Sequence, residues 1–271
     1  MTLTTIGLMA LLGCFTGFMA GLLGIGGGMI ITPFLIMLIP SSLIPHDHIV
    51  HVAIATSLAT IAFTSLSSVR AHHKRGAVLW NVVWSVAPGI LVGAVAGAQI
   101  AGLMSTFWIS ILFACFVGFS AFKMFMNKPP KPERQLPGAI GKFFMGIGIG
   151  ILSALVGAGG GFISVPLMVW CNVPMKNAVA TSAAFGFPIA FFGTIGYVIS
   201  GWNAPNLPPW PIDLGYICIP ALFAVAITSV LFAPLGAKVA HTIDTKPLKK
   251  IFACLLCCIA VYMLRQAYLA M

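Results

Sequence analysis

The chain has 271 residues, of which 60% are hydrophobic and only 7% are charged. Soluble domains carry about a quarter charged residues, so this composition all but excludes a water-soluble fold and indicates a polytopic membrane protein in a lipid bilayer. The net charge of +10 comes from short basic clusters between long apolar runs, which is typical of cytoplasmic loops and not of a nucleic-acid surface. We therefore expect no nucleic-acid partner.

Apolar runs of about 18 residues or more predict transmembrane helices. Six such runs are uninterrupted, and two further apolar regions are broken by glycine clusters. In chain order these are Leu3–Ile39 (broken at Gly24–Gly28), Ile49–Val69, Val78–Ala101, Phe107–Met126, Phe143–Trp170 (broken at Gly157–Gly161), Ala178–Ile199, Leu214–Leu235 and Ile251–Tyr268.

Most of the Lys and Arg residues fall into three clusters, which the positive-inside rule places in the cytoplasm. The clusters are Arg70, Lys74 and Arg75; Lys123, Lys128, Lys131, Arg134 and Lys142; and Lys238, Lys246, Lys249 and Lys250. The Asn203–Asp213 loop has no Lys or Arg and should face outward. Each glycine-broken region must then enter and leave on the same side, as a hairpin or re-entrant pair, and the second half is inverted relative to the first.

The two halves also resemble each other in sequence. Gly24–Pro33 aligns with Gly157–Pro166, with six of ten positions identical. Four further matches follow in the same order: Ala55-Thr56-Ser57 with Ala180-Thr181-Ser182, Pro88 with Pro220, Gly97-Ala98 with Gly236-Ala237, and Phe113-Ala114-Cys115 with Phe252-Ala253-Cys254. We therefore predict an all-α protein with a first repeat over 1–126, a basic linker over 127–141 and a second repeat over 142–271. Each repeat has three full transmembrane helices and a glycine-broken helical hairpin.

Duplicated halves with glycine breaks at matching positions are typical of secondary transporters, whose binding site lies where the repeats meet. The triplets Gly26–Gly28 and Gly159–Gly161 permit positive φ and leave backbone N–H groups uncovered. A helix beginning near Met29 or Phe162 would present its positive dipole end to an anion. The alternative is that the triplets only allow a tight turn or close packing, as we expect for Gly89-x-x-x-Gly93-x-x-x-Gly97.

Four hydroxyls early in their spans are candidate donors to a substrate: Thr56, Ser57, Thr181 and Ser182. The alternative is that they bond to carbonyls of their own helices. His51 and Lys176 precede the two Ala-Thr-Ser blocks and are candidates for attracting an anion at the mouths of a pathway, or else ordinary interfacial residues.

The sequence offers little for catalysis or metal binding. The four acidic residues lie outside the span cores, so a carboxylate relay is hard to build and an anion is the better cargo. Cys254-x-x-Cys257 has no second ligand pair, and we expect no metal and no cofactor. His72-His73 has no carboxylate partner, so no catalytic residue is assigned. No Walker motif is present, so the energy must come from a gradient or another subunit.

The segments GLLGIGGGMIITPFL and SALVGAGGGFISVPLM, each followed by Ala-Thr-Ser, resemble the sulfite exporter TauE/SafE family over essentially the whole chain. The resemblance implies a carrier in the bacterial inner membrane, tied to anions such as sulfite, sulfoacetate or other sulfonates. It implies a functional role for the two glycine triplets, Pro33, Pro166 and the two Thr-Ser pairs.

The expected function is therefore export of a small sulfur-containing anion by alternating access. Import of another small anion and an anion channel are the alternatives. The Gly89, Gly93 and Gly97 face fits packing within the chain or a homodimer equally well.

Overall fold

The computed structural model describes residues 3–23, 27–40, 44–126, 135–202, 204, 207, 212–240 and 246–270. This part of the chain is almost entirely helical, and eight of its helices are long and apolar enough to cross a membrane. The elements are α1 (Leu3–Leu23), α2 (Gly28–Leu38), α3 (Ile49–His73), α4 (Trp80–Leu103), α5 (Thr106–Met126), α6 (Ala139–Val156), α7 (Gly161–Trp170), α8 (Met175–Gly201), β1 (Ile212–Leu214), β2 (Ile217–Cys218), α9 (Ile219–Ala240) and α10 (Lys246–Leu269). The prediction of a helical multi-pass membrane protein is confirmed.

Each glycine-broken region forms a long helix followed by a short one. α1 has 21 residues and α6 has 18, enough for about 30 Å of bilayer core at about 1.5 Å per residue. α2 and α7 have 11 and 10 residues and reach only about half of that thickness. The predicted hairpins are therefore unequal, with one full-length arm and one half-length arm.

Two predicted boundaries are wrong. α9 begins at Ile219 and not at Leu214, because the preceding residues form a small antiparallel hairpin in which Leu214 pairs with Ile217. The turn passes through Gly215 at φ +58°. Hydropathy places the start of the helix too early because Leu214, Ile217 and Cys218 continue the apolar run of α9. α6 begins at Ala139, inside the predicted 127–141 linker.

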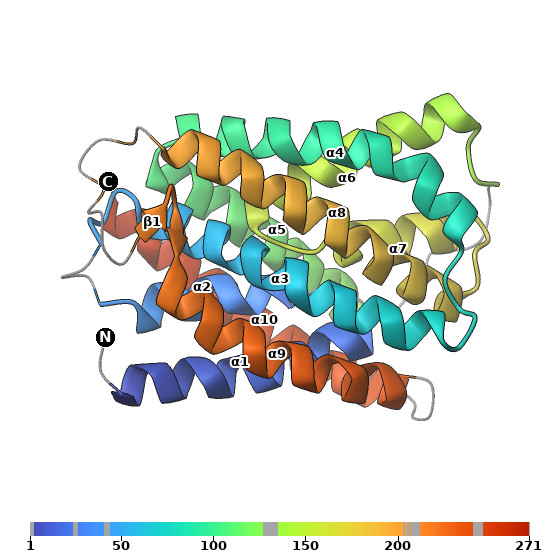
Figure 1. Cartoon of the computed structure of the whole chain (residues 1–271), viewed down its shortest axis with the longest axis horizontal. Helices are drawn as coiled ribbons and strands as arrows, with labels where there is room; N and C mark the ends of the chain where they lie inside the picture. Colours follow the sequence, from blue (N-terminus) through green and yellow to red (C-terminus); the bar gives the residue numbers. More distant parts are fainter. Residues whose placement is uncertain are drawn as a thin grey trace.

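The long helices lie side by side along one direction, and both termini lie at the same end of the bundle as β1 (Figure 1). The α3–α4 connection lies at the opposite end, where α5, α7 and α9 also finish. Of the described basic residues, Arg70, Lys123, Lys142 and Lys238 lie on helix ends that meet there, whereas Arg265 lies near the end of α10 at the β1 end. This is the asymmetry that the positive-inside rule predicts, and we expect this end to be cytoplasmic.

The two halves contact each other through matched helix pairs. α3 packs on α8 in the interior, α5 packs on α10, α1 packs on α9 and α4 packs on α6. The members of the α1–α9 and α4–α6 pairs run in parallel, whereas each helix of the second half runs opposite to its counterpart in the first (Figure 1). An inverted duplication requires these directions. The inverted repeat itself stays a prediction.

The glycine stripe on α4 is an internal packing surface. A Cβ added to Gly89 or Gly93 would overlap the backbone of Phe143 or Ile147 on α6, so the two helices touch without side chains between them. The face of Gly89, Gly93 and Gly97, which could equally have served a homodimer, is therefore covered within one chain. A homodimer through another face stays a prediction.

One of the predicted matches between the repeats is wrong. Pro88 lies well inside α4, whereas Pro220 is the second residue of α9, so the two prolines are not equivalent. Gly97 and Gly236 are equivalent: Gly97 meets α6 and Gly236 meets α1, each time on the backbone of the other half's first helix. The spacing from Pro220 to Gly236 exceeds that from Pro88 to Gly97 because the two prolines do not correspond. No inserted segment in the helices is needed to explain it.

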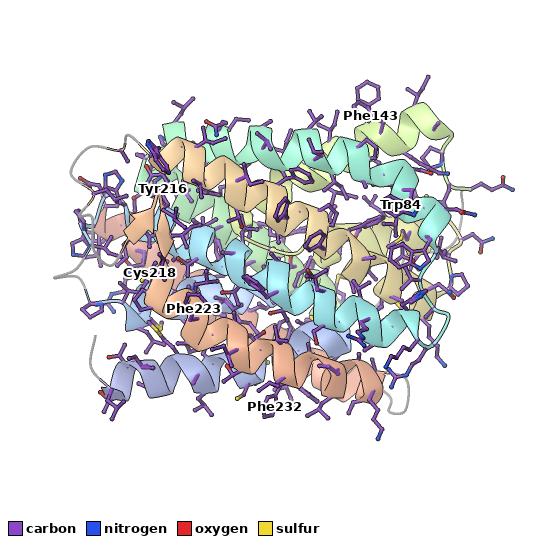
Figure 2. All side chains as sticks on the ribbon, in the orientation of Figure 1. Trp84, Phe143, Tyr216, Cys218, Phe223 and Phe232 are labelled. Atoms are coloured by element: carbon purple, nitrogen blue, oxygen red, sulfur yellow. The ribbon has the colours of Figure 1, made fainter. Side chains whose placement is uncertain are left out.

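Large apolar side chains cover the outside of the bundle, as a lipid-facing surface requires. Trp84 is 70% exposed and Phe223 is 58% exposed. Figure 2 shows Tyr216 and Cys218 at the β1 end and Trp84 toward the opposite end.

We predict that Gly150→Val on α6 destabilises the folded protein by roughly 2 kcal/mol or more through overpacking. A Cβ there would lie 2.6 Å from the Ile90 carbonyl oxygen of α4. Gly148 lies on the same helix with nothing within 4 Å of an added Cβ, so Gly148→Val is the matched control. Thermal unfolding of both variants in detergent measures the difference, and equal midpoints would contradict the close α4–α6 contact.

Candidate functional site

Each short helix is preceded by a glycine in a left-handed conformation. Gly27 has φ +73° and directly precedes α2, and Gly160 has φ +76° and directly precedes α7. A side chain at either position would be strained, because L residues rarely adopt this region. The expectation that the two triplets permit positive φ is confirmed at these two residues. Gly26 of the first triplet lies outside the described residues.

The first turn of each short helix is built in the same way. In α2 the N–H groups of Ile30 and Ile31 both donate to the Gly27 carbonyl, at 3.1 and 3.2 Å. In α7 two N–H groups donate to the Gly160 carbonyl, at 3.1 and 2.9 Å. The N–H groups of the first two residues of each helix precede this ladder and form the positive end of the helix dipole.

The first break touches the second in the bundle interior. A Cβ added to Gly28 would overlap the Gly157 carbonyl oxygen. Ser57 joins the two segments, since its hydroxyl donates to the Gly157 carbonyl at 3.2 Å and lies 3.5 Å from the Gly28 carbonyl. One predicted hydroxyl of α3 therefore lies where the two halves meet.

Thr56 and Thr181 bind the backbone at the start of two other helices. The Thr56 hydroxyl accepts the N–H of Cys218 at 2.9 Å, and the Thr181 hydroxyl accepts the N–H of Leu79 at 3.0 Å. Cys218 and Leu79 directly precede α9 and α4. Each threonine thus fixes the start of the helix that packs on it from the other half. A role in substrate binding stays a prediction for both.

The remaining predicted residues surround the second break. The hydroxyl of Ser182 lies 2.7 Å from that of Ser164, which is also 2.9 Å from the Gly160 carbonyl. Gly159 lies beside Gly186 of α8, whose added Cβ would be 3.7 Å from the Gly159 carbonyl oxygen. The break is therefore lined by small residues and hydroxyls.

Sequence reasoning missed two hydroxyls beside this break. Thr32 and Ser153 are fully buried, and neither hydroxyl has a hydrogen-bond partner in the described part of the chain. The Thr32 hydroxyl is 3.0 Å from the position of a Cβ added to Gly157, and that of Ser153 is 3.2 Å from one added to Gly160. Their signal was their spacing, because each lies about one helical turn from a residue of a glycine motif.

A separate cavity of about 220 Å³ lies at the β1 end, lined by residues that include Asp47, His51 and Tyr216. The His51 Nε2 donates to the carbonyls of Ala101 and Met104, each at 3.1 Å, and the ring stacks on Tyr216 at 5.2 Å between centroids. Burial raises the pKa of Tyr216, so this phenol stays protonated.

The structure does not bring His51 and Lys176 together. His51 is 3% exposed and lies under Tyr216 in the first turn of α3. Lys176 is exposed in the first turn of α8, at the opposite end of the bundle. The prediction that both act at pathway mouths is untested.

We predict that Thr181→Val destabilises the protein by about 1 kcal/mol, because the Leu79 N–H loses its acceptor while side-chain volume is kept. Thr181→Ser retains the hydroxyl and is the matched control. Unfolding midpoints in detergent measure both variants. If valine and serine behave alike, the hydroxyl does not stabilise the start of α4.

Comparison with known proteins agrees with this architecture. The sequence model of the family described as "Sulfite exporter TauE/SafE" matches residues 9–263. No solved structure matches the chain.

Several curated relatives align over most of their length. A probable membrane transporter protein of Haemophilus influenzae is 34% identical, over 96% of this chain and 98% of the relative. A probable membrane transporter protein of Methanocaldococcus jannaschii is 28% identical, over 95% of this chain and 94% of the relative. The probable membrane transporter protein YunE of Bacillus subtilis is 30% identical, over 72% and 78%. The chain therefore belongs to the sulfite exporter TauE/SafE family of membrane transporters.

Proposed function

We propose that this chain is a secondary transporter that exports small sulfur-containing anions, such as sulfoacetate, other sulfonates or sulfite, across the bacterial inner membrane. The observation that carries the proposal is the contact between the two glycine breaks at Gly28 and Gly157. Two short helices begin beside this contact and point their N-terminal dipoles into the interior. Such convergent helix ends favour an anion.

The charge distribution supports an anion as cargo. None of the ten described helices contains Asp or Glu, so no carboxylate repels an anion from the bundle interior or attracts a cation into it. The described Lys and Arg side chains lie near helix ends, and they leave the described interior without fixed positive charge. An anion would therefore be bound by hydrogen-bond donors and helix dipoles.

The packing of the breaks favours a carrier over a channel. Gly28 lies in backbone contact with Gly157, and Ser57 bridges their carbonyls, so the described interior is closed at this point. A channel needs a continuous opening, whereas a carrier needs a closed site that opens to one side at a time. Because α2 and α7 belong to different halves, movement of one half against the other would open the contact.

The test is counterflow in proteoliposomes preloaded with sulfoacetate and supplied with labelled sulfoacetate outside. We expect saturable uptake of label that competing sulfonates or sulfite inhibit. Non-saturable flux would indicate a channel. The absence of flux from protein shown to be folded would overturn the choice of substrate.

We predict that Gly160→Ala lowers this counterflow at least about tenfold, because alanine strains the left-handed turn that starts α7. Gly76 has a similar φ of +64°, with nothing within 4 Å of an added Cβ, and lies in the α3–α4 loop. Gly76→Ala therefore carries the same backbone strain away from the break. Equal transport by the two variants would show that the turn at Gly160 has no role in transport.

A further inference from the structure

Helical Ser and Thr hydroxyls ordinarily donate to a carbonyl one turn earlier in their own helix. Thr60 and Thr64 of α3 do so at 2.9 and 3.0 Å. The hydroxyls of Thr32 and Ser153 do not, although both side chains are fully buried. Burial of an unpaired hydroxyl is unfavourable, so we expect each hydroxyl to bind a partner that the described residues do not supply.

Thr32 and Ser153 approach the second glycine break from different halves of the chain. Thr32 lies on α2, and its hydroxyl is beside Gly157, where the break begins. Ser153 lies in the last turn of α6, and its hydroxyl is beside Gly160, the residue before α7. The two hydroxyls therefore flank a segment that also ends in the N-terminal N–H groups of α7.

We propose that Thr32 and Ser153 are the side chains that bind the transported oxyanion, each by donating its hydroxyl hydrogen to an oxygen of the ligand. This inference rests on the proposed function and names the side chains that hold its substrate. An anion placed in the break supplies the acceptor that each hydroxyl lacks. Hydrogen bonds to a charged acceptor are stronger than those between neutral groups, so the anion gains from both.

The test measures sulfoacetate counterflow in the variants Ser153→Ala and Thr32→Val. We expect each to raise the KM about tenfold, through loss of one hydrogen bond to a charged group, with the unfolding midpoint unchanged or raised. Ser110 of α5 is the matched control, because its hydroxyl is equally buried and equally without a partner. Ser110→Ala should leave the KM unchanged.

The outcomes separate this inference from the proposed function. Wild-type flux with an unchanged KM in Ser153→Ala and Thr32→Val would overturn the assignment of these side chains and leave the transporter intact. No flux in the wild type would overturn the proposed function itself.

Discussion

The structure depends on the hydrogen bonding of unwound backbone inside a bilayer, where water is not available to pair with it. Ser57 meets this need by donating to the Gly157 carbonyl beside Gly28. A donor can reach both breaks only from a helix that lies between them, and α3 is accordingly the most buried of the long helices. The central position of α3 and α8, and the outer position of the other helices, follow from this requirement.

Hydropathy and glycine spacing predicted the spans, the two breaks and the left-handed glycines, because bilayer thickness and backbone sterics depend on local sequence alone. The roles of hydroxyls were harder to predict. Thr56 and Thr181 were recognised as polar groups in apolar helices, but their partners, Cys218 and Leu79, are far away in sequence. Thr32 and Ser153 were passed over although each lies about one helical turn from a motif glycine, since a helical hydroxyl is expected to bond within its own helix.

Residues at matching positions of the two halves can have different surroundings in the folded protein. His51 and Lys176 occupy corresponding places before the Ala-Thr-Ser blocks. The hairpin that precedes α9 covers His51 with Tyr216, whereas Lys176 remains exposed. The short β1–β2 hairpin, which hydropathy could not detect, therefore gives the two ends of the bundle different chemistry.

The packing of helices from one half against the other half also affects how the protein is made. α1 packs mainly on α9 of the other half, so it meets this partner only after the intervening helices have been inserted. Its packing face includes Gly13, Gly17 and Gly21, which leave backbone open to lipid in the meantime. α1 therefore reaches its final packing late in biogenesis, after α9 has been made.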